Sequence, residues 1–413
     1  MSKFCPYATG ALNMKHNRSA LCFKSKNKNF VKEYKTIYDL LNNPPMNQTR
    51  LDLASGKWPE DNNCLSCVDN EKINGRSARI RAIDGLSETT TEWLKNNLNA
   101  DGSINTIINL ELRFRSSCNL ACRHCSSEYS TQWSKIIDEL GEQPYYDRDE
   151  ENDISLSKNI PISDWIEFIK EQINADIFKQ DPNLLFYLEF TGGEPFFQKE
   201  LYQFLEQLDQ HPEYKKRIEF AVTTNGIITN RFKNYDLKKL LSGFGKMWIC
   251  LSLDASENFY EYFRQNGNWE QATTGVIALS HDMPNTRVSF SVSPTVFQCL
   301  RADDIYKDFA KLLKRPLTRR DIIISDIYAP YYLRLDNAHP ELKKSLVKQL
   351  TESKIKHNDP AFDNLVDLSL KQLAQPGDIN EWIAFCDMTS RLDKIHNKNV
   401  FDYFPELKQY WIS

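Results

Sequence analysis

Three cysteines on one short segment are the residues of this chain best suited to metal chemistry. They lie in Cys118-Asn-Leu-Ala-Cys122-Arg-His-Cys125, a C-x3-C-x2-C spacing that follows directly on a predicted strand. Three thiolates so spaced can each bind one iron of a [4Fe–4S] cube and leave the fourth iron open to a substrate or cofactor. A zinc ion held by three thiolates is the alternative that the spacing alone leaves open.

A pair of glycines marks the end of the next predicted strand. Residues 187–190 read Tyr-Leu-Glu-Phe, and residues 191–195 read Thr-Gly-Gly-Glu-Pro. Glycines 192 and 193 let a ligand approach the backbone closely because they carry no side chain. The carboxylate of Glu194 can accept hydrogen bonds from an ammonium group. This turn therefore predicts a ligand site one βα unit after the cysteines.

Together the two motifs resemble those of the radical S-adenosylmethionine (SAM) enzymes, whose marks are C-x3-C-x2-C and Gly-Gly-Glu-Pro. The resemblance implies that Cys118, Cys122 and Cys125 bind a [4Fe–4S] cluster and that SAM chelates its open iron. One electron from the cluster would then cleave SAM to methionine and a 5′-deoxyadenosyl radical.

The resemblance also implies a set of SAM contacts. These are Gly192, Gly193 and Glu194 for the methionine ammonium, His124 beside the adenine, Asn225, Ser252 and Asp254 for ribose and carboxylate contacts, and Arg264 for the SAM carboxylate. For His124, simple packing is an equal alternative. Asn, Ser and Asp at strand ends are also ordinary turn residues.

A second cysteine group lies near the N-terminus. Its members are Cys5, Cys22, Cys64 and Cys67, and four thiols can close one metal site. The pattern resembles the twitch/SPASM auxiliary-cluster modules of radical SAM proteins, in the arrangement where the module precedes the barrel. That subgroup also shows Cys-Arg-x-Cys, Ser/Thr-Gln-Trp and a terminal Pro-Glu-Leu, which match residues 122–125, 130–133 and 405–407 here.

This second resemblance implies one auxiliary [4Fe–4S] cluster with four protein thiolates. A structural zinc ion bound by four thiolates is the rival. A fully ligated cluster favours electron transfer over direct binding of substrate.

Three further cysteines stand alone in the sequence. Cys250 and Cys386 lie in apolar runs and are expected in the core, where a free cysteine behaves as a small hydrophobe. Cys299 follows the fifth predicted strand on the side where βα barrels carry chemistry. It is therefore a candidate hydrogen-atom donor to a substrate radical.

Short β-rich runs alternating with helical patterns must position these residues. The predicted strands are 106–114, 184–190, 218–224, 247–253, 287–293 and 321–327, and the predicted crossover helices include 164–178 and 200–208. Such repeated βα units indicate a parallel sheet. Segments 341–352, 364–373 and 379–395 are predicted helices after the last strand.

The predicted fold is an α/β protein, a partial (βα)6 radical SAM barrel over residues 104–332. A small N-terminal Fe–S module over residues 1–85 precedes it, and a helical cap over residues 333–413 follows it.

Composition limits the class of protein and its partners. The chain has 413 residues, 41% of them hydrophobic, and a formal net charge of -4. This charge argues against nucleic acid as a partner. No apolar run reaches the roughly 18 residues that span a bilayer, and the first residues lack the apolar core of a secretory signal. We therefore expect a cytoplasmic protein without membrane contact.

The predicted function is hydrogen abstraction from a substrate C–H bond, followed by oxidation, cross-linking or epimerisation, with a peptide favoured as substrate. A dehydrogenase or epimerase of a small polar metabolite is the alternative among enzymes. Outside the enzymes, the alternative is a non-catalytic, metal-stabilised scaffold that binds a partner. Residues 138–153 hold eight acids and one arginine, which predicts either a solvated surface loop or a negative rim that attracts a cationic substrate. An electron donor such as flavodoxin or ferredoxin is the expected protein partner.

Overall fold

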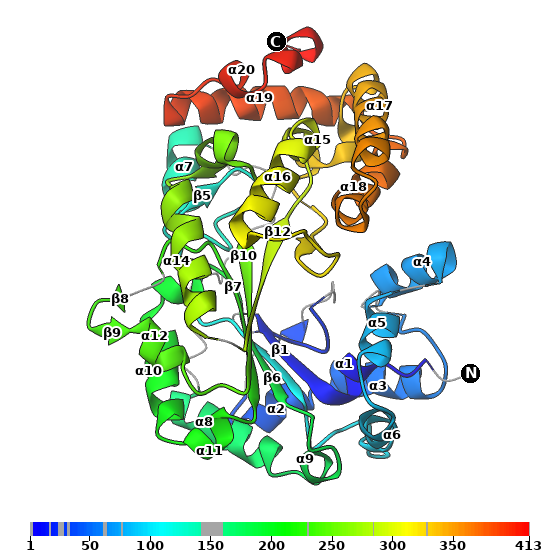
Figure 1. Ribbon diagram of the computed structural model, residues 1–413. Helices are drawn as coiled ribbons and strands as arrows, with labels where there is room; N and C mark the ends of the chain where they lie inside the picture. The colour runs from blue at the N-terminus through cyan, green and yellow to red at the C-terminus, as the bar shows by residue number, and fades with distance from the viewer. Residues whose placement is uncertain are drawn as a thin grey trace. The chain divides into compact units, whose positions relative to one another are not determined.

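The computed structural model describes residues 3–15, 18–23, 29–30, 34–60, 64–75, 77–141, 160–228, 231–283, 285–327 and 329–412 (Figure 1). The chain forms two compact units. The first contains Met1–Arg115, Glu151–Val222 and Lys239–Met247, and the second contains Ser116–Glu150, Thr223–Lys238 and Trp248–Ser413. The greater part of the acidic segment 138–153 lies outside the described residues.

The first unit is built on a sheet of six strands. Their order is β7-β6-β4-β1-β2-β3, with β1 at Ala11–Lys15, β2 at Arg18–Ala20, β3 at Asn29–Phe30, β4 at Asn109–Leu112, β6 at Phe186–Phe190 and β7 at Ile218–Thr224. Strands β1, β4, β6 and β7 pair in parallel, whereas β2 and β3 add antiparallel strands at the edge beyond β1.

The two faces of this sheet differ in chemistry. Phe114, which follows β4, and Phe190 of β6 both pack on Phe204 of helix α10, with ring centroids 6.2 and 5.3 Å apart. Since side chains alternate along a strand, Glu111 and Glu189 lie on the opposite face. The helix layer therefore covers an apolar face and leaves a polar one.

The helices of the first unit range in length from four to twelve residues. They are α1 (Pro6–Gly10), α2 (Ile37–Leu41), α3 (Pro44–Ala54), α4 (Leu65–Asn74), α5 (Ala78–Asp84), α6 (Glu88–Asn96), α8 (Ile162–Ile173), α9 (Ile177–Gln180), α10 (Lys199–Asp209) and α11 (Pro212–Lys215). Helix α12 (Leu237–Leu241) begins in the second unit and ends in the first.

The second unit holds the remaining βα elements. Strands β10 (Lys246–Ser252), β12 (Thr286–Val292) and β13 (Ile322–Ile324) lie in the order β13-β12-β10, and the first two residues of β10 belong to the first unit. Two-residue strands form the pairs β5 (Ala121–Cys122) with β11 (Arg264–Gln265) and β8 (Arg231–Phe232) with β9 (Tyr235–Asp236). Its helices are α7 (Gln132–Leu140), α13 (Tyr260–Phe263), α14 (Trp269–Asp282), α15 (Val296–Leu300), α16 (Ala302–Leu313), α17 (Pro340–His357), α18 (Pro360–Leu373), α19 (Ile379–His396) and α20 (Val400–Tyr403).

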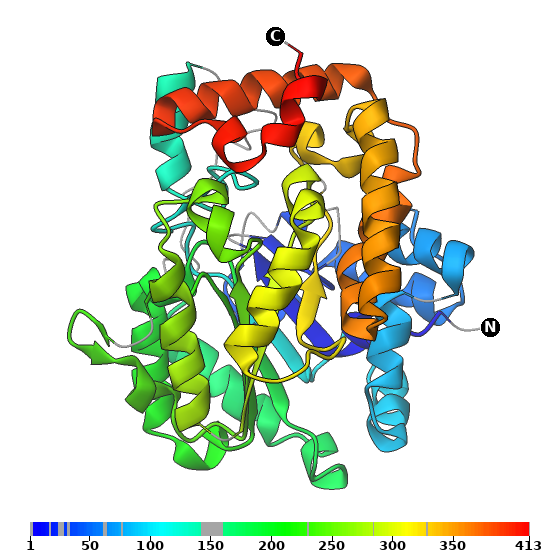
Figure 2. The ribbon, with the colours of Figure 1, turned by 45° about the horizontal axis from the view of Figure 1, so that its top comes forward.

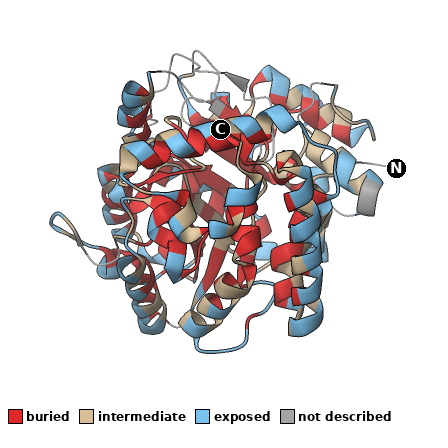
Figure 3. Ribbon diagram, turned by 90° about the horizontal axis from the view of Figure 1, so that it is seen from above, coloured by how far each residue is buried: buried red, intermediate tan, exposed pale blue. Residues whose placement is uncertain are grey.

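The C-terminal helices begin at side-chain caps. Asp359 accepts a hydrogen bond from the backbone N–H of Ala361 at the start of α18, and Asp378 accepts one from Asn380 at the start of α19. These carboxylates satisfy amides that have no partner inside the helix. Within the second unit, α19 begins near α17 and runs toward α7 (Figures 1 and 2). Its buried and exposed residues lie on opposite faces, as in most helices of the chain (Figure 3).

The structure confirms the mixed α/β class, and all six predicted strands are present. The predicted helix 164–178 is wrong as one element, because the chain leaves α8 at Asn174 and re-enters helix as α9. The N-terminal region was predicted as a cysteine-bearing module, and it also supplies β1 to the sheet. The predicted domain boundaries stay a prediction. No helix among the described residues has the length and apolarity needed to cross a bilayer.

A buried arginine ties together the N-terminal part of the first unit. Arg50 of α3 is 1% exposed. It donates hydrogen bonds to the carbonyls of Ala8 and Leu41, each at 2.8 Å, and to that of Gly102 at 3.3 Å. Burial lowers the pKa of Arg50 to about 9. Three separate segments therefore depend on one side chain for their hydrogen bonds.

Arg50→Met should lower the free energy of unfolding by about 3 kcal/mol, because buried carbonyls would lose their donors. Urea unfolding followed by circular dichroism measures this change. Arg81→Met on the exposed side of α5 is the matched control and should change it by less than about 0.5 kcal/mol. Equal effects of the two substitutions would contradict this account of Arg50.

Candidate metal and cofactor sites

The three-cysteine loop of the second unit is held by a strand pair and a small apolar cluster. Cys118 and Cys122 are buried together with Leu120, and Cys125 and Ile227 pack against them. Strand β5 places Cys122 opposite Arg264 of β11 in antiparallel register. The three thiols therefore belong to one anchored loop.

Hydrogen-bond donors surround the sulfur atoms. Cys118 Sγ accepts from the Leu120 N–H at 3.4 Å and from Asn225 Nδ2 at 3.9 Å, and Cys122 Sγ accepts from Arg264 Nη1 at 3.4 Å. Burial, followed by the charges of Cys122 and Cys118, raises the pKa of Cys125. The three sulfur atoms are thus near enough to influence one another. Donors aimed at thiolate sulfur are a means by which proteins tune iron–sulfur clusters.

These residues fit a three-thiolate cluster by the chemistry of their donor set. Across the described residues, no three His, Cys, Asp or Glu side chains already have the arrangement of a metal cage. What the loop supplies is three soft ligands on one segment, with N–H groups directed at two of them.

Arg264 and Asp254 form a buried ion pair beside this loop. Arg264 Nη2 bonds to Asp254 Oδ2, and its Nε donates to the Leu253 carbonyl at 3.1 Å. Burial opposes the charge of Arg264, but Cys122 and Asp254 outweigh it and raise the pKa of the guanidinium. Asp254 Oδ1 accepts from the Ser293 N–H at 2.5 Å. The predicted SAM contacts Asp254 and Arg264 are therefore brought together, and their contact with SAM stays a prediction.

The other predicted SAM contacts of the second unit surround the same residues. His124 stacks on Phe263 with centroids 5.0 Å apart, and its Nε2 lies 3.6 Å from Asp254 Oδ2. Burial lowers the pKa of His124 to about 4, so its ring is neutral at pH 7. Asn225 reaches the cysteine loop through Cys118, and Ser252 ends β10. Packing and adenine contact both remain open for His124.

The glycine turn belongs to the first unit and needs its glycines. Gly192 has φ +78°, and a Cβ built there would lie 2.1 Å from Arg113 Cδ. Gly193 also has positive φ. The Gly192 carbonyl accepts from Gln198 Nε2 at 3.2 Å, and Glu194 Oε1 accepts from the Phe196 N–H at 3.0 Å. The turn is thus rigid, and the Glu194 carboxylate is buried next to it.

The four N-terminal cysteines line a single cavity in the first unit. Cys5 precedes α1, Cys22 follows β2, Cys64 precedes α4, and Cys67 lies in the first turn of α4. Tyr7, Trp58 and Arg79 complete much of the wall. Burial raises the pKa of Cys5 to about 11. Four thiols around one cavity fit either a cluster or a zinc ion, so both predicted alternatives remain.

Cys299 is enclosed by the second unit. It lies on α15, is 2% exposed, and forms a hydrogen bond with Ser369 of α18. Burial raises the pKa of its thiol to about 12, so the S–H form is present at neutral pH. This is the form that a hydrogen-atom donor needs, and the donor role stays a prediction.

Sequence reasoning gave no role to Arg123, which directly follows the second cysteine of the loop. Its Nε donates to the Tyr262 carbonyl at 2.9 Å, its guanidinium lies 3.9 Å from the Tyr262 ring centroid, and its Nη2 pairs with Asp393 of α19. Arg123 therefore joins the cysteine loop to the C-terminal helices. The Cys-Arg-His-Cys motif was the signal for Arg123, whereas nothing in the sequence pointed to Asp393.

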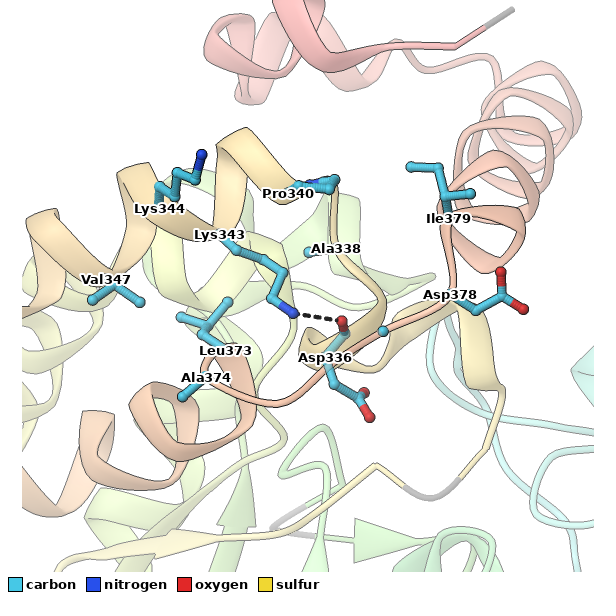
Figure 4. A pocket seen from close by; sticks show the side chains of 11 residues that line it. Asp336, Ala338, Pro340, Lys343, Lys344, Val347, Leu373, Ala374, Asp378 and Ile379 are labelled. Atoms are coloured by element: carbon cyan, nitrogen blue, oxygen red, sulfur yellow. Dashed lines mark hydrogen bonds between the residues drawn. The ribbon is translucent and has the colours of Figure 1, made fainter.

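A separate cavity lies among α17, α18 and the start of α19 (Figure 4). Val347, Leu373 and Ile379 line it, and Lys343 Nζ donates to the Asp336 carbonyl at 2.9 Å. None of the predicted cluster or SAM residues lines it, so it is not part of the candidate cofactor site.

Known proteins share parts of this chain. A model of the radical SAM superfamily matches residues 113–296. GTP 3′,8-cyclase of Aliarcobacter butzleri (strain RM4018) is 27% identical over 154 residues, 37% of this chain and 36% of the cyclase. The chain thus matches about a third of the length of that curated relative.

Two solved structures show a partial likeness. Native anSMEcpe with bound AdoMet has a TM-score of 0.39 and 18% identity, with 60% of this chain and 63% of that chain covered. Streptococcus suis SuiB bound to precursor peptide SuiA has a TM-score of 0.37 and 12% identity, with 71% of this chain and 58% of that chain covered.

Metal analysis of anaerobically reconstituted protein should separate the two cysteine groups. Replacing the three loop cysteines by Ala should remove about four irons per chain, because a cubane holds four. Replacing the four N-terminal cysteines should remove either about four more irons or one zinc. Cys386→Ala is the control and should leave both metals in place. Unchanged iron in the triple loop variant would contradict the loop as a cluster site.

Proposed function

We propose that this chain, whose residues 113–296 belong to the radical SAM superfamily, is an enzyme that cleaves SAM reductively and abstracts hydrogen from a substrate C–H bond. The single observation that carries this proposal is the anchored loop of three thiols with N–H donors directed at Cys118 and Cys122. The Gly-Gly-Glu turn supports it as the place for the methionine ammonium.

Cluster and SAM together supply a primary carbon radical that can take hydrogen from unactivated C–H bonds. The protein's own part is to bind, orient and exclude water. Cys118, Cys122 and Cys125 would hold the cluster, and the ion pair of Arg264 with Asp254 fixes the backbone around Cys122. In the first unit, the backbone of Gly192 and the carboxylate of Glu194 would receive the ammonium of SAM.

The N-terminal cysteines are proposed to bind an auxiliary cluster that transfers electrons to or from a substrate radical. A flavodoxin or ferredoxin in the cytoplasm would supply the electron that starts each turnover. We place a peptide first as substrate, by analogy with the modules that the N-terminal cysteines resemble. Oxidation or cross-linking would need the auxiliary cluster as electron acceptor, whereas epimerisation would need a hydrogen donor.

The two alternatives are an enzyme that acts on a small metabolite and a scaffold without catalytic activity. A small polar metabolite could replace the peptide, and the matched part of GTP 3′,8-cyclase belongs to an enzyme named for a small-molecule substrate. A non-catalytic scaffold would need neither a three-thiol loop nor a buried carboxylate behind two glycines. The donor set therefore favours an enzyme.

Reduced, reconstituted protein should convert SAM to 5′-deoxyadenosine and methionine, measured by liquid chromatography. Cys118→Ala together with Cys122→Ala and Cys125→Ala should lower this conversion at least 100-fold, because no cluster could form. Cys386→Ala should retain it. If the triple variant cleaved SAM at the parent rate, the proposed function would be wrong.

Cys299→Ser tests whether the enzyme is an epimerase, which needs a hydrogen-atom donor, or catalyses oxidation or cross-linking, which do not. An O–H bond is a much poorer hydrogen-atom donor than S–H, so an epimerase should lose product at least tenfold while SAM cleavage continues. Solvent deuterium incorporation into the product is the measurement, with Cys250→Ser as control. Full product formation by Cys299→Ser would remove the donor role from this residue.

A further inference from the structure

The polar face of the first unit's sheet carries a row of residues that the proposed cofactor sites do not use. Asn13 of β1 is in register with Glu111 of β4, and Glu111 is in register with Glu189 of β6. Residues in register on parallel strands point to the same side. Ala221 of β7 continues the row beside Glu189 with a small side chain. Two carboxylates and one carboxamide thus stand next to each other across three strands.

This row lies opposite the helix layer. Leu110 and Leu112, the neighbours of Glu111, are fully buried toward the side where Phe114 and Phe190 pack on α10. Glu111 is nevertheless only 4% exposed. A carboxylate held so far from water normally needs a cation or several donors.

Hydroxyl groups satisfy part of this need. Thr191 Oγ1 donates to Glu111 Oε1 at 2.6 Å, and Tyr187 OH donates to Glu189 Oε2 at 3.4 Å. A carboxylate offers about four acceptor positions, so Glu111 can accept further hydrogen bonds from a ligand. Glu111 and Glu189 thus place two carboxylates side by side on this face.

An independent observation points to a ligand at the same place. Asn13 is 3% exposed, and its buried Nδ2 has no hydrogen-bond partner among the described residues. A buried amide without a partner is destabilising, and a hydrogen bond to a ligand carbonyl would satisfy it. The row thus offers a donor at Asn13 and acceptors at Glu111 and Glu189.

The spacing of the row limits the ligand. Neighbouring strands lie about 4.8 Å apart, so acceptors stand one and two such steps from Asn13. An extended lysine side chain places its ammonium about 6 Å from its Cα, and arginine reaches slightly further. A basic residue in a peptide therefore carries a cation and a backbone carbonyl at a fitting separation.

We propose that Asn13, Glu111 and Glu189 form a subsite for a lysine or arginine residue of a peptide substrate. The description of the ligand as a substrate rests on the proposed function. Glu189 lies on the strand that leads into Thr191 and Gly192, so the subsite adjoins the turn assigned to the methionine ammonium within the same unit.

Three probes test the subsite on reconstituted full-length protein by isothermal titration. They are the Nα-acetyl methylamides of lysine, arginine and the neutral isostere norleucine. A cationic probe should bind at least tenfold more tightly than the norleucine probe. Glu111→Gln and Glu189→Gln should each remove that preference, since they keep shape and lose charge. Glu206→Gln, the same change on the exposed side of α10, should keep it.

Asn13→Asp covers the case in which a buried Gln variant fails to fold. This change removes the amide donor and adds a third carboxylate, so it should weaken binding of the norleucine probe and widen the ratio of cationic to norleucine affinity several-fold. Equal binding of cationic and neutral probes by the parent protein, or a preference that survives both Gln substitutions, would overturn the subsite.

SAM cleavage by the parent protein is scored separately. A parent that prefers the cationic probe but cleaves no SAM would lose the proposed function and keep the cation subsite. A parent that cleaves SAM without any preference would keep the function and lose the subsite.

Discussion

The buried ion pair of Arg264 with Asp254 is the interaction on which the cysteine loop depends. Both residues are almost fully buried, so each charge would be costly without the other. Arg264 also donates to Cys122 Sγ and to the Leu253 carbonyl, which ties the loop to the end of β10. Asp254 has φ +52°, a conformation that its bonds to Arg264 and Ser293 must hold in place. This ion pair thus holds together the end of β10, the cysteine loop and the donor to the Cys122 sulfur.

The alternation of side chains along β4 and β6 is the corresponding constraint in the first unit. Large apolar residues fill one face against α10, which leaves every second position free to carry polar groups. Position 192 at the end of β6 must be glycine, because the side chain of Arg113 occupies the space that a Cβ would need. The parallel strands can therefore carry polar side chains on one face while the other face packs its apolar side chains against the helices.

Local patterns in the sequence predicted the central elements well and the long-range contacts poorly. Strand 218–224 was placed with its observed bounds because Ile218, Phe220 and Val222 alternate with other residues and the turn residues Asn225-Gly226 follow. The break between α8 and α9 was missed, since Ile173 and Ile177 keep helical spacing across it. The pairing of β1 with β4 joins residues about a hundred positions apart, and no local pattern encodes such a contact. The same holds for Arg123 with Asp393, which only the folded second unit brings together.

The N-terminal cysteines illustrate how a short module becomes part of a larger unit. Their cavity includes Tyr7, and burial together with the charges of Cys22, Cys5 and Glu189 raises the pKa of this phenol. Tyr7 is therefore a neutral hydroxyl between the cysteine cavity and the polar face of the sheet. Because β1 follows α1 directly, the segment that carries Cys5 and Tyr7 also supplies the strand that bears Asn13. A substitution that destabilised β1 would thus disturb both the cysteine cavity and the row of Asn13, Glu111 and Glu189. The N-terminal cysteine region is therefore an integral part of the first unit.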